Sequence, residues 1–477
     1  MGNTIFDMLW RDHQVRALSD GSSLIYIDRV FLHERTGGIA LKSLTDAGRA
    51  VRRPSSVFCT IDHIVDTFPG RGDDTRMPGG SAFITTTREM AQKAGINFFD
   101  IGDPRQGIVH VVSPEQGIAL PGLTLVCPDS HTCTLGGLGA FAWGIGSTDG
   151  EHALATSTLR INRPKSMQIW LDGTLREGVG AKDIILALIG KYTAAGGSGY
   201  MLEFAGPAAQ ALPVEARLTL CNMAVEFSAF TGLIAPDDTV FEYVAGRPFA
   251  PKGAVFDAAL SYWRTLQSAP DAHFDKRLEL DVSQLSPQVT WGTSPAHVAG
   301  IDQPIPDPSQ LAVDASTQTS LEKALNYMDL QPGSSVEGLP IGGAFIGSCT
   351  NSRLSDLRRA AAILKGRKVA EGVNAICVPG SSQVKAAAEA EGLHHVFQDA
   401  GFSWRESGCS MCFYAGGESF GHRQRVITST NRNFESRQGP ETRSHLASPE
   451  TVAASAICGA ITDPRKLTRG VVTRDAA

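Results

Sequence analysis

Short apolar runs alternate with helical patterns along much of the chain. The runs that predict buried strands are Ser23 to Ile27, Gly107 to Val112, Leu123 to Val126, Gly343 to Ile346 and Asn374 to Val378. Residues Ala181 to Lys191 and Asp356 to Lys365 instead show the apolar spacing that predicts helices. Strands that alternate with helices are typical of α/β layers, so we predict an α/β fold with a largely parallel sheet.

A proline-rich stretch interrupts this pattern. Residues Ser294 to Thr319 contain several prolines and few large apolar side chains, which favours a connection between two units. A chain of 477 residues is also too long for one compact core. We therefore expect an N-terminal unit over residues 1–300 and a C-terminal unit over residues 301–477.

The composition is that of a soluble globular protein. Hydrophobic residues make up 42% of the chain, charged residues make up 19%, and the formal net charge is -6. This acidic balance gives no reason to expect a nucleic acid partner. Residues Met1 to Trp10 lack the basic start and apolar run of a signal peptide, and no apolar run is long enough to span a membrane. We expect a cytoplasmic protein without a membrane segment.

The chain has nine cysteines, an odd number with irregular spacing. This pattern predicts reduced thiols or metal ligands rather than a disulfide framework. Cys59, Cys221, Cys377 and Cys458 have apolar or small neighbours in the sequence, so we expect them to be buried as small hydrophobic residues.

Three other cysteines, Cys349, Cys409 and Cys412, lie in two loops of small residues. The first loop, Phe345 to Arg353, leads from an apolar strand into a helical pattern near Leu354, where the helix N-terminus would favour a thiolate. A Cys-x-x-Cys pair alone fits zinc, a redox dithiol or core burial, but zinc requires a fourth ligand and none stands out. Three ligands instead suit a 4Fe-4S cluster that leaves one iron open to a substrate.

The N-terminal half holds three clusters of acid-base residues. They are Thr60 to His63, Gly107 to His110 and Asp129 to Thr132, and they lie at predicted strand ends or in glycine-flanked turns. A histidine beside a carboxylate has a fixed tautomer and a raised basicity, which suits proton transfer. Any one of these histidines alone is more simply a satisfied core or surface residue. Three clusters together favour a site, with the candidates Asp62, His63, His110, Asp129 and His131.

Two further segments carry polar groups that suit chemistry. Asn222 and Glu226 lie four residues apart in a helical pattern, which would place them on one face, although Glu226 could also be a solvated surface charge. Arg432 and Arg437 lie in a polar, turn-rich stretch near the C-terminus. Their guanidinium groups suit bidentate binding of substrate carboxylates, and surface ion pairing is the alternative.

These segments together resemble the aconitase superfamily, and within it most closely the large subunits of 3-isopropylmalate dehydratases. The resemblance covers nearly the whole chain. The motifs that carry it are Leu24 to Arg29, Asp62-His63, Gly107 to His110, Pro128 to Thr132, Cys221 to Ala224, Ser286 to Gly292, the Cys349 loop, Gly408 to Cys412 and Asn431 to Phe434.

The resemblance implies a core of three α/β/α domains around one 4Fe-4S cluster, two of them within residues 1–300 and the third within residues 301–477. In aconitases a fourth, swivelling domain completes the site, and this chain would lack it. A separate small subunit that carries the swivelling domain is therefore expected as partner, together with a hydroxy diacid as substrate.

The resemblance also implies roles for individual residues. Cys349, Cys409 and Cys412 would hold the cluster, and Asn222 would lie near the site. The acid-base pairs would be Asp62 with His63, His110 with Asp129, and His131 with Glu226. The first pair would help to protonate the departing hydroxyl, while Arg432 and Arg437 would bind substrate carboxylates.

The reaction implied is the isomerisation of 2-isopropylmalate to 3-isopropylmalate in leucine biosynthesis, with a base on the small subunit removing the carbon-bound proton. Two segments depart from the family pattern, Ile64 to Gly80 and Phe413 to Glu418. Because both adjoin expected site residues, they leave open another 2-hydroxy diacid such as citramalate, dimethylmalate or homoaconitate. A cluster-free RNA-binding protein is a remote alternative, which the acidic charge and the three cysteines do not favour.

Overall fold

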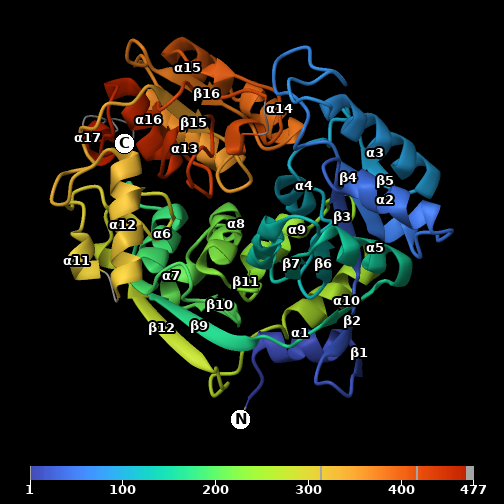
Figure 1. Cartoon of the computed structure of the whole chain (residues 1–477). Coiled ribbons are helices and arrows are strands. Elements are labelled where there is room, and N and C mark those ends of the chain that lie inside the picture. The colour runs from blue at the N-terminus through green and yellow to red at the C-terminus, as the bar shows by residue number, and fades with distance from the viewer. Residues whose placement is uncertain (1, 312–313, 415–416, 469–477) are drawn as a thin grey trace, which may run out of the picture.

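Parallel β-sheets organise the chain (Figure 1). The computed structural model describes residues 2–311, 314–414 and 417–468, and over these residues the chain forms three parallel sheets and two smaller antiparallel ones. The predicted α/β fold with parallel sheets is therefore confirmed.

The first parallel sheet has five strands in the order β5-β4-β3-β6-β7. Their bounds are β3 (Arg29–His33), β4 (Val57–Thr60), β5 (Asn97–Phe99), β6 (Thr124–Cys127) and β7 (Phe141–Gly144). The helices along this part of the chain are α1 (Ile5–His13), α2 (Gly37–Asp46), α3 (Gly80–Ala94), α4 (Val109–Glu115) and α5 (Ser147–Thr156). An antiparallel sheet of β1 (Gln14–Ala17), β2 (Ser23–Tyr26) and β8 (Thr158–Ile161) accompanies it.

The second parallel sheet has four strands in the order β11-β10-β9-β12. The bounds are β9 (Lys165–Asp172), β10 (Tyr200–Ala205), β11 (Thr231–Leu233) and β12 (Lys276–Asp281). The helices here are α6 (Ala181–Tyr192), α7 (Pro207–Gln210), α8 (Val214–Asn222), α9 (Asp238–Val244) and α10 (Ala254–Trp263). A hairpin of β13 (Gln288–Thr290) and β14 (Val298–Gly300) follows.

The third parallel sheet has five strands in the order β17-β16-β15-β18-β19. The bounds are β15 (Gly343–Ile346), β16 (Asn374–Cys377), β17 (Ser403–Trp404), β18 (Arg425–Thr428) and β19 (Arg443–Leu446). The helices are α11 (Pro308–Leu311), α12 (Ala315–Met328), α13 (Leu354–Leu364), α14 (Ser382–Ala390), α15 (Leu393–Ala400), α16 (Pro449–Cys458) and α17 (Arg465–Thr468).

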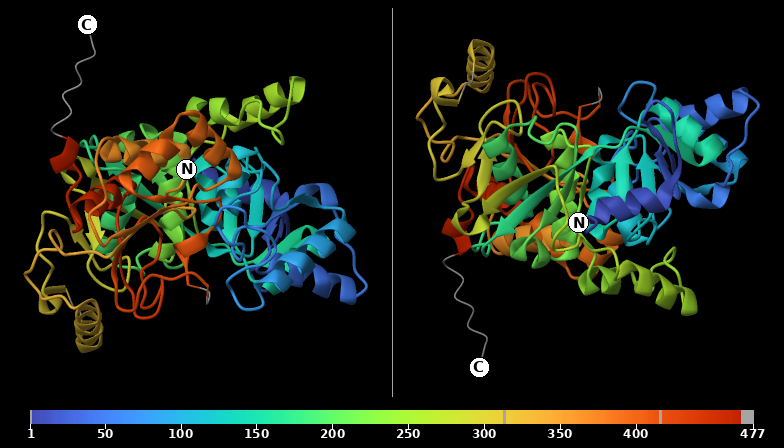
Figure 2. Two further views of the ribbon diagram at one scale, coloured as in Figure 1. Left: turned by 90° about the horizontal axis from the view of Figure 1, so that it is seen from above. Right: turned by 90° about the horizontal axis from the view of Figure 1, so that it is seen from below.

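The proline-rich stretch Ser294 to Thr319 joins the second sheet to the third. It contains β14 and α11 and enters α12, while residues 312–313 within it lie outside the described part of the chain. Helices α10 and α12 project from the body of the molecule (Figure 2). The division into units at residues 300 and 301 stays a prediction.

Most predicted elements agree with the structure, but one predicted strand is wrong. Gly107 to Val112 is not a strand, because Ile108 leads directly into the helix α4. Residues 109–114 are buried, so the apolar run belongs to a short helix enclosed on all sides, a pattern that apolar content alone does not distinguish from a strand. Cys458 is also not buried: it is exposed at the end of α16, where the last helical turn leaves the core.

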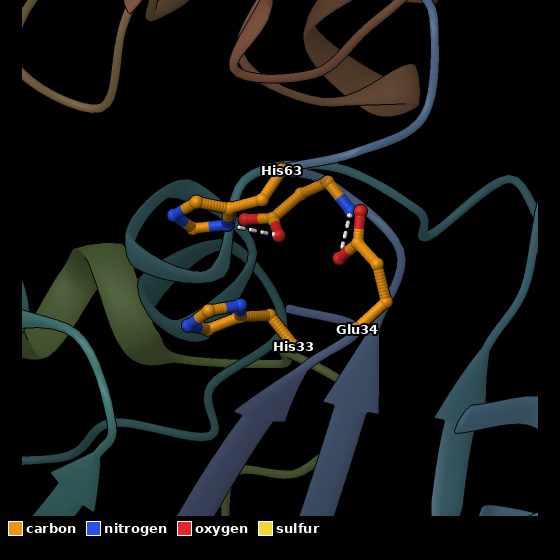
Figure 3. A group of neighbouring side chains, drawn as sticks. His33, Glu34 and His63 are labelled. Atoms are coloured by element: carbon orange, nitrogen blue, oxygen red, sulfur yellow. Dashed lines mark hydrogen bonds and ion pairs between the residues drawn. The ribbon is translucent and has the colours of Figure 1, made fainter. Parts of the chain in front are cut away.

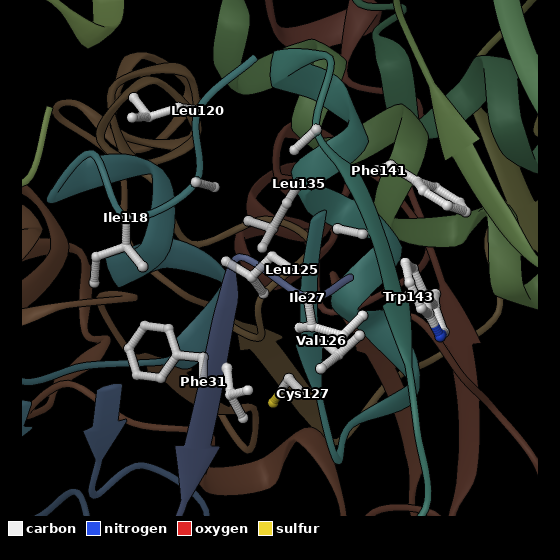
Figure 4. Packing of buried hydrophobic residues seen from close by; sticks show 14 of the residues in the cluster. Ile27, Phe31, Ile118, Leu120, Leu125, Val126, Cys127, Leu135, Phe141 and Trp143 are labelled. Atoms are coloured by element: carbon white, nitrogen blue, oxygen red, sulfur yellow. The ribbon is translucent and has the colours of Figure 1, made fainter. Parts of the chain in front are cut away.

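The strand ends of the first sheet are fixed by a tightly packed apolar core (Figure 4). Phe31 on β3, Leu125 on β6 and Phe141 on β7 are fully buried in one cluster. Close packing of this kind resists any shift of one strand against the next, since a shift in register would expose the buried face. The loops that leave these strands therefore start from rigid positions.

The first and third sheets meet at a backbone junction beside α4. Gly107 forms an isolated antiparallel bridge with Ser381, and the Ile108 amide donates to the Gly380 carbonyl at 2.8 Å. A Cβ atom on Gly107 would lie 2.5 Å from the Ser381 Cα atom and 2.7 Å from the Gly380 oxygen. The two backbones approach so closely only because residue 107 has no side chain.

No helix of the described residues is long and apolar enough to cross a membrane.

Substitution of Gly107 by alanine should force this junction apart. We expect Gly107→Ala to lower the free energy of unfolding by about 1–3 kcal/mol, since the added methyl group meets rigid backbone. The control is Gly72→Ala, because a Cβ atom there meets nothing within 4 Å. Thermal unfolding of both variants checks this; equal midpoints would show that the junction accommodates a side chain.

Candidate active site

A cavity of about 330 Å³ lies between the first and third sheets. Its lining includes most of the residues predicted to form a site: His63, His110, Asp129, His131, Cys349, Cys409, Cys412, Arg432 and Arg437. Many of these residues follow the carboxyl ends of parallel strands, where loops of α/β folds meet a ligand. A larger cavity of about 780 Å³ lies against the second sheet, and its described lining contains none of the predicted site residues.

The three predicted cysteine ligands line this one cavity. Cys349 follows β15 through a turn at Ser348, which has a left-handed backbone with φ of 75°. The Asn222 side chain amide donates to Cys349 Sγ at 3.2 Å, and Ser348 Oγ lies 3.3 Å from Cys412 Sγ. Cys409 is fixed through its backbone, since its amide donates to the Asp62 carbonyl at 2.8 Å.

The surroundings of the three sulfurs fit a metal cluster. Burial raises the pKa of Cys349 to about 12 and holds the pKa of Cys409 well above its ordinary value, so buried thiolates would require a cation beside them. Asn431 Nδ2 and Arg437 Nη2 point hydrogens at the sulfurs, at 3.5 Å from Cys349 and 3.7 Å from Cys412. Donors of this kind support cysteine-bound iron-sulfur clusters.

Asp129 is the centre of the acid-base residues. Its carboxylate lies 3.1 Å from His63 Nε2 and 3.1 Å from His110 Nε2, and it accepts the backbone amide of His131 at 2.7 Å. Although burial opposes ionisation, the charge of His110 and hydrogen bonds from the histidines hold the pKa of Asp129 well below its usual range. Asp129 is therefore ionised, and the histidines around it come from the loops after β4 and β6 and from helix α4.

His63 bridges two carboxylates. Its Nδ1 donates to Asp62 Oδ1 at 2.6 Å, and its Nε2 donates to Asp129 Oδ2. Burial alone would lower the pKa of His63, but the charge of Asp62 and the hydrogen bonds to both carboxylates raise it well above the ordinary value. The imidazole is thus held in its protonated form at the wall of the cavity, ready to act as an acid.

Two residues beside this pair were not predicted from the sequence, His33 and Glu34 (Figure 3). The His33 ring stacks on the His63 ring with centroids 4.0 Å apart, and burial together with the charge of His63 lowers the pKa of His33 to about 4. Glu34 accepts the backbone amides of Asp62 at 2.9 Å and Ile64 at 2.5 Å, and it fixes the loop that carries His63. Burial raises the pKa of Glu34 to about 7.

The nearest polar atoms of His33, Glu34, Asp62 and His63 lie within 4.8 Å of one another, a spacing that a metal ion could also use. The carboxylates of this group already accept hydrogen bonds. We therefore interpret the four residues as a hydrogen-bonded network for proton transfer. The signal that could have found His33 and Glu34 is their place at the carboxyl end of β3, beside the loop that follows β4.

Glu226 joins a histidine to an arginine. Its Oε1 accepts from His131 Nε2 at 2.8 Å and lies 2.7 Å from Arg432 Nε. The expected shared α-helical face of Asn222 and Glu226 is wrong: α8 ends at Asn222, and a 3-10 helix, Met223–Phe227, carries Glu226. The tighter 3-10 turn breaks the four-residue spacing. Asn222 therefore contacts Cys349, whereas Glu226 contacts His131.

A buried lysine that was not predicted, Lys182, positions the loop of Arg432. Its ammonium group donates to the carbonyls of Ser429, at 2.9 Å, and Thr430. Burial lowers the pKa of Lys182 to about 7. The sequence gives no sign of this contact, because 247 residues separate Lys182 from Ser429. The contact becomes visible only in the fold, where α6 packs behind the loop after β18.

The atypical segment Ile64 to Gly80 packs against the second cysteine loop. Arg71 donates to the Ser407 carbonyl, and Thr67 Oγ1 donates to Ser410 Oγ at 3.0 Å. The segment therefore supports the cysteines rather than forming a separate surface loop. In the other atypical segment, Phe413 lines the cavity, while residues 415–416 lie outside the described part of the chain.

Comparison with known proteins identifies the family. A family model described as "Aconitase family (aconitate hydratase)" matches residues 5–459. The chain belongs to the aconitase family. Its resemblance to aconitases and its aconitase-like α/β fold are thereby confirmed.

Two relatives match nearly the full length of the aconitase-family chain. A "3-isopropylmalate dehydratase large subunit 1" from Bradyrhizobium diazoefficiens is 50% identical, with 98% of each chain covered. A "3-isopropylmalate dehydratase large subunit" from Roseiflexus castenholzii is 49% identical, covering 98% of this chain and 99% of its own. The crystal structure of Thermococcus kodakaraensis aconitase X (holo-form) has 13% identity and a TM-score of 0.45, covering 86% of this chain and 84% of its own.

Removal of the central carboxylate should destabilise the protein. We expect Asp129→Asn to lower the free energy of unfolding by about 3 kcal/mol near neutral pH, because it leaves protonated His63 without one of its two carboxylates. The folded-state pKa of Asp129 is depressed, so its stabilisation is present above the ordinary aspartate pKa. The difference from wild type should therefore shrink as the pH falls below about 4.

Urea unfolding across this pH range measures the effect. The matched control is Asp74→Asn, an exposed carboxylate in the atypical segment. If Asp129→Asn is as stable as Asp74→Asn near neutral pH, Asp129 is not the centre of the charge balance.

Proposed function

We propose that this chain is the large subunit of a hydro-lyase that converts 2-isopropylmalate to 3-isopropylmalate by removing and re-adding water, as a step of leucine biosynthesis. The observation that carries the proposal is a single cavity that combines three cysteine sulfurs, a histidine that bridges two carboxylates, and arginines. The near full-length similarity to two 3-isopropylmalate dehydratase large subunits supports this choice of substrate.

The cysteines Cys349, Cys409 and Cys412 would hold one 4Fe-4S cluster. When bound, such a cluster supplies an iron with an open position, which draws electrons from the hydroxyl oxygen of the substrate. The donors from Asn222 and Asn431 lie beside Cys349, where they would stabilise its sulfur in the bound state.

His63 would protonate the departing hydroxyl group. Its Nε2 proton faces Asp129 at 3.1 Å, and both residues line the cavity, whereas the Nδ1 proton is committed to buried Asp62 at 2.6 Å. Asp62 thus orients the ring, and Asp129 stabilises the imidazolium until the proton leaves. General acid assistance of this type accelerates reactions by about 10²- to 10⁴-fold.

Arg437 would bind a carboxylate of the substrate. Its Nε is buried and has no hydrogen-bond partner among the described residues, and its ring neighbours Phe413 and Phe434 hold the guanidinium in place. Arg432 already pairs with Glu226 and donates to Ser130 Oγ at 3.0 Å. Arg432 would therefore orient Glu226 and His131 as well as meet substrate.

A small subunit would complete the site. Both relatives are named as large subunits, and this chain is similar to them over 98% of its length. The partner would carry the swivelling domain and the base that removes the proton from carbon, because elimination requires a base opposite the acid that releases hydroxide.

Turnover tests the substrate. The chain is co-expressed with a small subunit of the same family, reconstituted anaerobically with iron and sulfide, and offered 2-isopropylmalate, citramalate, dimethylmalate and homoaconitate in parallel. We expect 3-isopropylmalate to form, with 2-isopropylmalate the preferred substrate. A cluster-loaded complex that turns over one of the other acids but leaves 2-isopropylmalate untouched would show that the site serves a different diacid.

Loss of any cluster cysteine should remove the iron. We expect Cys349→Ala, Cys409→Ala and Cys412→Ala to lose most of the iron and acid-labile sulfide that the wild type binds, because each variant leaves only two cysteine ligands for the cluster. Cys458→Ala is the control, since Cys458 is exposed on α16. Full iron content in a Cys349, Cys409 or Cys412 variant would contradict the assignment of that ligand. A wild type that takes up no cluster would favour the binding-protein alternative.

A further inference from the structure

Arg35 lines the cavity on the side of the first sheet. It lies two residues after the end of β3, next to Glu34, and its side chain is exposed. The guanidinium carbon lies 4.8 Å from the centroid of the Phe413 ring. Among the residues that the structure describes, no hydrogen bond or ion pair holds Arg35. Its charge is therefore available to an anion at the open side of the cavity.

Phe413 connects Arg35 to the rest of the site. The Arg437 guanidinium lies 5.8 Å from the Phe413 ring centroid, and the His63 ring lies 6.0 Å from it. One aromatic ring thus contacts two arginines and the proposed acid. Cation-π contacts hold flexible arginine side chains near the ring without neutralising their charge. Phe413 is a positioning residue in this arrangement, and it belongs to a segment that departs from the family pattern.

The three arginines that line the cavity differ in whether a carboxylate pairs with them. Arg432 is matched by Glu226 at 2.7 Å. Neither Arg437 nor Arg35 has a carboxylate partner in the described part of the chain, and both contact Phe413. A hydroxy diacid brings two carboxylates, and an unpaired guanidinium suits each of them.

We propose that Arg35 binds the substrate carboxylate farther from the hydroxyl-bearing carbon, while Arg437 binds the carboxylate attached to that carbon. Arg437 takes the inner position because its Nη2 lies 3.7 Å from Cys412 Sγ. Arg35 takes the outer position because it is exposed at the cavity. This inference rests on the proposed function, since it assumes a diacid substrate. Arg35 then makes the site selective for diacids over monoacids.

Binding to two matched acids tests this assignment without turnover. The probes are 2-isopropylmalate and 2-hydroxy-2,3-dimethylbutyrate, which keeps the hydroxyl, the inner carboxylate and the isopropyl group but lacks the outer carboxylate. Titration calorimetry is done on the reconstituted complex with Arg35→Gln, Arg35→Lys, Arg437→Gln and, as control, Arg16→Gln. Arg16 is an exposed arginine on β1 that does not line the cavity.

We expect Arg35→Gln to weaken 2-isopropylmalate binding about 10- to 100-fold and to leave the monoacid unchanged, since it removes one charge-assisted contact. Arg437→Gln should weaken both acids, because both have the inner carboxylate. Arg35→Lys should retain part of the diacid affinity, and Arg16→Gln should match wild type for both acids. Iron content and thermal unfolding of each variant show that the complex is intact.

Diacid binding by Arg35→Gln that equals the control would overturn the proposal. An Arg35→Gln variant whose only defect is weaker association with the small subunit would overturn it as well, and would place Arg35 at the subunit interface. Failure of the proposed function has a different signature, because wild type would then not turn over 2-isopropylmalate. In that case the same comparison is made with whichever diacid wild type does bind, against its monoacid counterpart.

Discussion

The contacts of one carboxylate with three histidine residues are the constraint on which the site depends. Asp129 needs His63, His110 and His131 around it, and these residues come from three different stretches of chain. They meet only if the strands of the first sheet keep their register. The apolar packing around Phe31 enforces that register, so the core of the sheet and the charge balance of the cavity are one requirement.

Residues close together in the sequence could be predicted, and partners far apart could not. Asp62 and His63 are adjacent, and the spacing of Cys409 and Cys412 is a local motif, so their grouping was visible in the sequence. Lys182 donates to carbonyls of the loop after β18, and Glu34 accepts backbone amides about 30 residues away in the sequence, so neither contact leaves a local pattern. The apolar run that begins at Gly107 was wrongly predicted as a strand for a related reason. Whether such a run forms a helix or a strand depends on the distant segments that enclose it.

The two halves of the chain divide the proposed chemistry. The first sheet supplies the proton network, in which stacked His33 stays neutral beside protonated His63. The loops of the third sheet supply the sulfurs and the inner arginine. Asn222, at the end of α8 between the two, contacts Cys349, so the second sheet also fixes the site. The segments that depart from the family pattern lie where they support the sulfurs or line the cavity.

The most direct test of this account is Mössbauer spectroscopy of the complex of large and small subunits, reconstituted anaerobically with ⁵⁷Fe. If the three cysteines bind one cluster with one iron open to the hydroxyl of the diacid, addition of 2-isopropylmalate should change the spectrum of a single iron site and leave the other iron sites of the cluster unchanged. A cluster whose spectrum does not respond to 2-isopropylmalate, in a complex that binds this acid, would contradict the account.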